Sequence, residues 1–212
     1  MKIGIIGLGL MGGSMGLALK DIGQIQQRYI NRIVGYDNNP LHAQQALNLG
    51  LIDECVALNE IWQCDVVFLS VPLGGIIEII QSLTPDMIHP QITLIDVGGA
   101  KVEILKSIPE WLRTYFVGAH PMCGTEFFGP SAALAELYKN NIVILPKLGS
   151  SKYLETEIEI QNNTGAQKLY NNFVKGKTFD TYFNKTSLYK YPKLAHFMKD
   201  YLEASIEIIK KT

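Results

Sequence analysis

The six residues GLGLMG at positions 7–12 decide how the first part of the chain folds. The apolar run before them, residues 2–7 (KIGIIG), is typical of a short buried strand, and residues 12–20 begin a helix. In a G-x-G-x-x-G loop the first glycine permits a tight turn, the second lets a pyrophosphate approach the backbone, and the third allows close helix–strand packing. The residues expected to contact a dinucleotide are Gly7, Gly9, Leu10, Met11 and Gly12.

Two other interpretations of residues 1–20 are weaker. A membrane anchor needs about 20 apolar residues, and this run is shorter and contains six glycines. A secretory signal would share the charged start and apolar centre, but no small-residue cleavage site with a polar start follows Lys20. A glycine turn with a purely structural role stays open, because the motif alone is not specific.

The composition is that of a soluble globular protein. The chain has 212 residues, 47% hydrophobic and 18% charged, with a net charge of -1. Without a basic excess we expect no nucleic-acid partner and no membrane partner. Three cysteines and four histidines show no metal-ligand spacing, so we expect no metal and no disulfide framework, and a cytoplasmic location fits best.

Strand and helix patterns alternate along the chain. Residues 65–72 (DVVFLSVP) form a continuous apolar run, as expected of a strand covered on both faces. Residues 76–83 supply a helical crossover to a neighbouring strand at 91–98, and further strands are predicted at 115–120 and 141–146. The pattern predicts an α/β fold with a Rossmann-like, doubly wound and mainly parallel sheet.

The second predicted strand, residues 32–37, ends in Asp37. An acidic side chain at this place accepts hydrogen bonds from the adenosine ribose, and no arginine follows that would receive a 2′-phosphate, which favours NAD over NADP. The alternative is that Asp37 only caps the next helix, which Asn39-Pro40 should begin and which should end near Gly50.

The last part of the chain has a different texture. Residues 152–192 are polar, and residues 194–209 predict an amphipathic helix. We therefore expect a dinucleotide-binding domain at 1–148 and a short, partly helical C-terminal region at 149–212. The apolar face of the helix predicts a homodimer. That face comprises Leu194, Phe197, Met198, Tyr201, Leu202, Ile206 and Ile209.

The most specific motif is GAHPMCGTEFFGP, residues 118–130, directly after a predicted strand. Together with GLGLMGGS, GYDNNP, LSVP and DVGGAK, it makes residues 1–148 resemble the prephenate and arogenate dehydrogenase family of tyrosine biosynthesis. The resemblance implies a small-molecule substrate, prephenate or arogenate. Its ring alcohol would be oxidised with NAD while the ring loses carbon dioxide, giving 4-hydroxyphenylpyruvate from prephenate.

The resemblance also implies site residues. His120 would be the catalytic histidine, and a neutral imidazole there could accept the proton of the ring hydroxyl, a contribution of about 10²- to 10⁴-fold. Thr125 and Glu126 would face the substrate, although the same residues are common at a helix start. Cys123 is interpreted as a packing residue. The residues implied on the nicotinamide side are Ser70, Val71 and Pro72.

Two features depart from the family's pattern. The family has a serine that orients the histidine where this chain has Gly99, and the C-terminal region is short and contains no arginine, the last being Arg113. Arginine suits a dicarboxylate such as prephenate because it binds carboxylates bidentately. Two alternatives therefore stay open: a truncated, non-catalytic NAD-binding homologue, and another dehydrogenase of the same architecture such as a 3-hydroxyacid enzyme.

Overall fold

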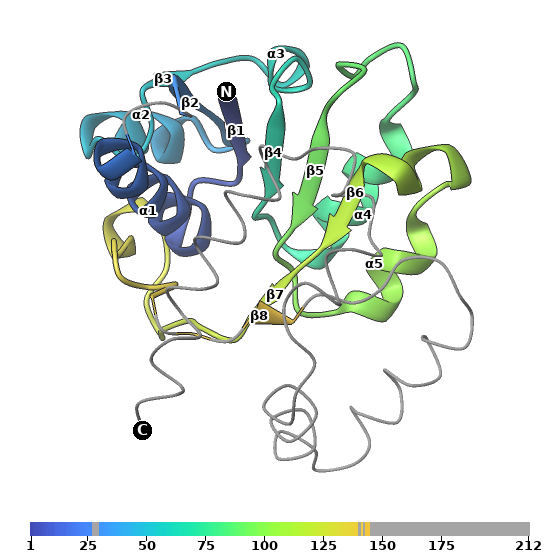
Figure 1. The fold of residues 1–212 in the computed structure, drawn as a ribbon. Helices are drawn as coiled ribbons and strands as arrows, with labels where there is room; N and C mark the ends of the chain where they lie inside the picture. Colours follow the sequence, from blue (N-terminus) through green and yellow to red (C-terminus); the bar gives the residue numbers. More distant parts are fainter. Residues whose placement is uncertain (27–29, 140, 142, 145–212) are drawn as a thin grey trace. The chain divides into compact units, whose positions relative to one another are not determined.

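The computed structural model describes residues 1–26, 30–139, 141, 143 and 144 (Figure 1). Six parallel strands form one sheet in the order β3-β2-β1-β4-β5-β6. The strands are β1 (Lys2–Ile6), β2 (Arg32–Tyr36), β3 (Glu54–Cys55), β4 (Val66–Leu69), β5 (Thr93–Asp96) and β6 (Phe116–Gly118). The helices between them are α1 (Leu10–Gln26), α2 (Pro40–Asn48), α3 (Leu58–Ile61), α4 (Leu73–Ser82), α5 (Lys101–Ser107) and the 3-10 helix η1 (Glu110–Tyr115). The predicted Rossmann-like fold is confirmed.

Helices cover both faces of the sheet. On one face, a Cβ added at Gly12 of α1 would lie 3.0 Å from the Ile5 side chain. On the other face, a Cβ at Gly4 would lie 3.2 Å from Ile61 of α3. Because neighbouring residues of a strand point to opposite faces, the all-apolar sequence of β4 is explained: each of its side chains is buried under one helical layer or the other.

Helix α2 begins where the sequence predicts. The Asn39 side chain accepts a hydrogen bond from the Leu41 N–H at 3.0 Å, and Pro40 is the first helical residue. The helix ends at Asn48, and Gly50 follows with a φ of +69°, a conformation that glycine adopts without strain. Start and end therefore agree with the predicted boundaries.

The predicted strand at 115–120 is divided in the structure. Its first part, β6, joins the sheet beside β5, and the last ladder bond runs from the Ala119 N–H to the Asp96 carbonyl at 2.9 Å. After this bond the chain leaves the sheet, and β7 (His120–Pro121) pairs antiparallel with β8 (Val143–Ile144). The predicted strand at 141–146 is thus outside the main sheet.

The chain divides into two units, Met1–Leu145 and Pro146–Thr212. The predicted boundary at 148, the polar segment 152–192 and the amphipathic helix at 194–209 lie outside the described residues, so they and the homodimer stay predictions. None of the helices described here is long and apolar enough to cross a membrane.

Candidate active site

The glycine loop sits at the carboxyl end of β1. Gly7 has a φ of +85°, and its N–H donates to the Tyr36 carbonyl at 2.9 Å. A Cβ at Gly12 would lie 1.8 Å from the Gly7 carbonyl oxygen, so the first helical turn of α1 packs directly against the backbone of Gly7. Both positions require glycine, as the motif predicts.

Gly9 has different surroundings. A Cβ added there would meet only the Gly129 nitrogen within 4 Å, at 4.0 Å. The space over Gly9 is therefore open, and it lies at the start of α1, where helical N–H groups lack intrahelical acceptors. An anionic group could approach the backbone at this point.

A distant segment packs against the start of α1. The Tyr138 hydroxyl donates to the Met11 carbonyl at 2.7 Å, and the Leu134 N–H donates to the Ser14 hydroxyl at 2.9 Å. Tyr138 and Ser14 are buried. In Figure 1 the yellow segment that contains η2 (Pro130–Ala132) lies beside α1. The residues after the histidine motif are thereby connected to the glycine loop.

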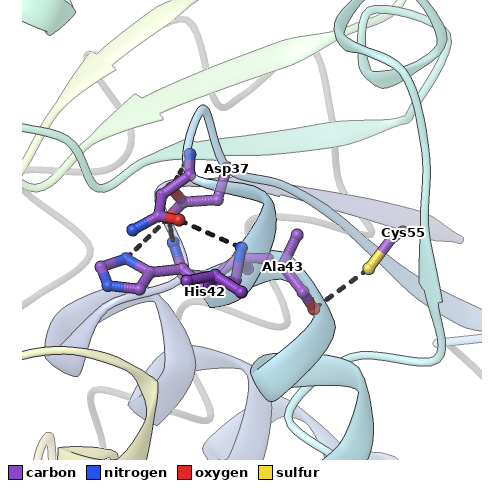
Figure 2. Close-up of polar contacts among 7 residues, drawn as sticks. Asp37, His42, Ala43 and Cys55 are labelled. Atoms are coloured by element: carbon purple, nitrogen blue, oxygen red, sulfur yellow. Dashed lines mark hydrogen bonds and ion pairs between the residues drawn. The ribbon is translucent and has the colours of Figure 1, made fainter.

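Asp37 lies at the end of β2, with its side chain 8% exposed. Its carboxylate accepts the Leu8 N–H at 2.8 Å and the Asn39 N–H at 2.9 Å, so it links the glycine loop to the start of α2. The His42 Nδ1 lies 3.8 Å from the Asp37 Oδ2 (Figure 2). Because Asn39 caps α2, the alternative that Asp37 only caps this helix is wrong.

A nearby contact holds α2 against the sheet. The Cys55 thiol of β3 donates to the Ala43 carbonyl at 3.2 Å, on the far side of α2 from Asp37 in Figure 2. This contact links α2 to the edge strand β3. In the described part of the chain, no three side chains of His, Cys, Asp or Glu come together to hold a metal ion.

Ser70, Val71 and Pro72 follow β4 and lie next to the glycine loop. A Cβ at Gly7 would come within 2.6 Å of the Ser70 carbonyl oxygen and 2.7 Å of the Val71 side chain. The Ser70 hydroxyl is shielded from solvent and has no hydrogen-bond partner among the described residues. A buried hydroxyl of this kind is unusual, and this one lies at the carboxyl edge of β4.

His120 is half-buried on β7, directly after the sheet edge. A Cβ at Gly99 would lie 3.3 Å from the His120 Nε2 and 3.4 Å from the Cε1, so the imidazole ring stands against the Gly99 backbone. Burial lowers the pKa of His120, and the positive charge of Lys101 lowers it further. The ring is therefore held in its neutral form, which can accept a proton.

Asp96 and Lys101 are site residues that the sequence reasoning did not single out. Lys101 donates to Asp96, and their side chains are 3% and 0% exposed respectively. Burial raises the pKa of Asp96, while Lys101 and the backbone N–H groups of Gly98 and Ala119 oppose that rise. The sequence feature that could have indicated this pair is an acidic and a basic residue on either side of Gly98-Gly99, at the end of an apolar strand.

The two residues that the resemblance implies to face the substrate lie in an exposed loop. Thr125 and Glu126 are exposed, the Thr125 hydroxyl accepts the Phe127 N–H at 3.2 Å, and no helix begins there, so the alternative of a helix start is wrong. In the described region neither residue forms a hydrogen bond or ion pair with His120. Burial raises the pKa of the Cys123 thiol, which agrees with a packing residue.

Comparison with known proteins identifies a family for this chain. Residues 17–169 match the family described as prephenate dehydrogenase, nucleotide-binding domain. The chain is 31% identical over 145 residues to prephenate dehydrogenase of Bacillus subtilis, and this alignment covers 66% of the chain and 38% of that protein. It is 30% identical over 148 residues to cyclohexadienyl dehydrogenase of Zymomonas mobilis, covering 68% of the chain and 48% of that protein.

A solved structure shares the fold. Prephenate dehydrogenase from A. aeolicus, crystallised with hydroxyphenyl propionate and NAD+, superposes with a TM-score of 0.61 at 24% identity. The alignment covers 100% of this chain and 86% of that one. The chain spans less than half the length of the two relatives matched by sequence.

Proposed function

The chain belongs to the prephenate dehydrogenase family through its nucleotide-binding domain, and on this premise we propose that it catalyses the NAD-dependent oxidative decarboxylation of prephenate to 4-hydroxyphenylpyruvate. The observation that supports the proposal best is a half-buried, neutral imidazole at the carboxyl edge of the sheet, where ligands bind in such folds. The reaction needs a proton acceptor at that edge.

The residues present fit NAD. The open space over Gly9 admits the pyrophosphate, and the Asp37 carboxylate has acceptor sites for ribose hydroxyls. Ser70 lies beside the glycine loop at the carboxyl end of β4, where the nicotinamide would bind. The negative charge of Asp37 disfavours a 2′-phosphate, so NAD is preferred over NADP. When bound, NAD supplies the acceptor for the hydride that leaves the substrate ring.

The role of His120 follows from the balance of the reaction. Hydride leaves C4 of the ring, the C4 hydroxyl becomes a carbonyl and its proton passes to the neutral His120 imidazole. The ring carboxylate leaves as carbon dioxide, the electrons of the broken bond pass through the ring to the C4 carbonyl oxygen, and the proton returns from the imidazolium to that oxygen, which becomes the phenol of the product. Gly99, Thr125 and Glu126 would contact the substrate around the imidazole.

One observation favours a second candidate, a non-catalytic NAD-binding homologue. Gly99 provides no hydroxyl beside the His120 ring. Arogenate, which has an amino group where prephenate has a keto group, is the alternative substrate.

The test is an absorbance assay for NADH with the full chain. Prephenate and NAD are expected to give turnover, with arogenate and NADP run in parallel to decide substrate and cofactor. His120→Asn should lower turnover by about 10²-fold or more and leave NAD binding by calorimetry unchanged. Equal turnover in His120→Asn rejects the role of His120, and NAD binding without any turnover in the native chain favours the non-catalytic homologue.

A further inference from the structure

The buried pair of Asp96 and Lys101 occupies the turn between β5 and α5. Asp96 is the last residue of β5 and Lys101 the first of α5. The Asp96 Oδ1 accepts hydrogen bonds from the Lys101 Nζ and, at 3.1 Å, from the Gly98 N–H. The Asp96 Oδ2 is shielded from solvent and has no hydrogen-bond partner in the described part of the chain.

The turn contacts both the His120 ring and the backbone just before His120. The Lys101 N–H donates to the Gly99 carbonyl at 3.0 Å, which fixes the backbone that faces the imidazole ring. The Asp96 carbonyl accepts the N–H of Ala119, the residue before His120, at 2.9 Å. Backbone hydrogen bonds of Asp96 and Lys101 therefore hold the Gly99 backbone, against which the ring lies, and the backbone just before His120.

Stability alone does not explain a charged pair at this place. Removing two charges from water is costly, and buried ion pairs can often be replaced by apolar side chains without loss of stability. The neighbouring strand β4 is apolar throughout, and Leu94 and Ile95 of β5 are almost fully buried. A pair of charges in such a core, next to a proposed catalytic group, points to a role in the site.

We infer that Asp96 and Lys101 are positioning residues for His120, which fix the turn beneath the imidazole and set its protonation state through the net charge of the pair. This inference rests on the proposed role of His120 in the reaction. Lys101 favours the neutral, proton-accepting ring, while the Asp96 carboxylate limits this effect so that the ring stays basic enough to accept a proton. The lowered pKa of His120, caused by burial and by Lys101, agrees with the role of Lys101.

The other charged and titratable groups around the histidine are few. The motif loop carries Cys123 and Glu126, and the remaining charged residues of α5, Glu103 and Lys106, are exposed. Among the described charges, Lys101 alone contributes to the pKa shift of His120. Changes at Lys101 should therefore act directly on its titration, and changes at Asp96 should act by altering how far the charge of Lys101 is offset.

The experiment follows the His120 imidazole by NMR in the full chain, without substrate or cofactor. His120→Asn identifies its signal among the four histidines. Lys101→Met should raise the titration midpoint by on the order of half a pH unit, because a neighbouring cation is lost. Asp96→Asn should lower the midpoint by a comparable amount, because the negative charge that offsets Lys101 is lost. Lys106→Met, on the exposed side of the same helix, should leave it unchanged.

Opposite shifts support the inference, because structural damage alone has no reason to produce them. Shifts of equal sign in the two folded variants, or none, overturn it. If Asp96→Asn does not fold, Lys101→Arg takes its place: arginine keeps the charge and should keep the midpoint, and equal midpoints for the Arg and Met variants overturn the inference. Opposite shifts together with full turnover of His120→Asn would reject the proposed function and leave the electrostatic coupling standing.

Discussion

At the scale of single residues, two glycines of one loop have opposite surroundings. A Cβ at Gly12 would lie 1.8 Å from the Gly7 carbonyl oxygen, whereas a Cβ at Gly9 would meet only the Gly129 nitrogen at 4.0 Å. The first contact is impossible without moving the backbone, and the second position is open. Gly12 is therefore required for close packing of α1 on the loop, and Gly9 is proposed to leave room for the bound dinucleotide.

This difference predicts separable effects of substitution. Gly9→Val should leave the melting temperature nearly unchanged and weaken NAD binding by about tenfold or more, because the side chain fills the space proposed for the pyrophosphate. Gly12→Ala should destabilise the protein by about 1–3 kcal/mol through overpacking. Thermal melts without ligand and calorimetry with NAD measure the two effects. NAD binding by Gly9→Val with native affinity would contradict the proposed cofactor site.

At the scale of elements, the segment of η2 and the residues after it hold the start of α1. The Tyr138 hydroxyl reaches the Met11 carbonyl, and the Leu134 N–H reaches Ser14, across 127 and 120 positions of sequence. The segment starts at Pro130, where the histidine motif ends, and its Tyr138 contacts Met11 beside the glycine loop. The residues that directly follow the proposed proton acceptor's loop therefore pack against the proposed cofactor loop.

Tyr138→Phe tests this connection. Loss of the buried hydrogen bond should cost about 1 kcal/mol of stability and weaken NAD binding several-fold, because the first turn of α1 loses a restraint. The matched control is Ser107→Ala, which removes a hydroxyl that donates to the Ile104 carbonyl at 2.7 Å in α5. The control should lose stability without losing NAD affinity. Equal NAD affinity in both variants would show that the segment does not support the loop.

The elements also show which features are encoded locally. Burial of both sheet faces leaves continuous apolar runs such as 65–72, and the Asn39-Pro40 pair marks the start of α2, so the central strands and α2 were predictable. The short elements β3, α3, α5 and η1 were not predicted. The division of 115–120 was not predictable, because it depends on where the ladder with β5 ends. The pair of Asp96 and Lys101 was also missed, because its burial depends on the packing of β5, α5 and β6 rather than on local pattern.

At the scale of the whole described unit, Asp53 connects several elements. Its carboxylate accepts the Ile33 N–H of β2 at 2.7 Å and lies 2.7 Å from the Lys20 Nζ of α1. Partial burial alone would raise the pKa of Asp53, but the hydrogen bonds from Lys20 and Ile33 and the charges of Lys20 and Arg32 lower it overall. Folding therefore favours the ionised carboxylate. The stability it contributes is present above the pKa of the unfolded chain and is lost as the pH falls through the lower pKa of the folded protein.

This sign gives a prediction for unfolding by urea. Asp53→Asn should reduce the free energy of unfolding at neutral pH by up to about 1 kcal/mol, the range of a partly exposed ion pair. The difference from the native chain should shrink as the pH falls below about 4, where the carboxylate becomes protonated. Glu110→Gln is the control, because Glu110 is 91% exposed in its ion pair with Arg113 and should matter little at any pH. If the deficit of Asp53→Asn stays the same at neutral and acid pH, the carboxylate acts through its shape and hydrogen bonding rather than its charge.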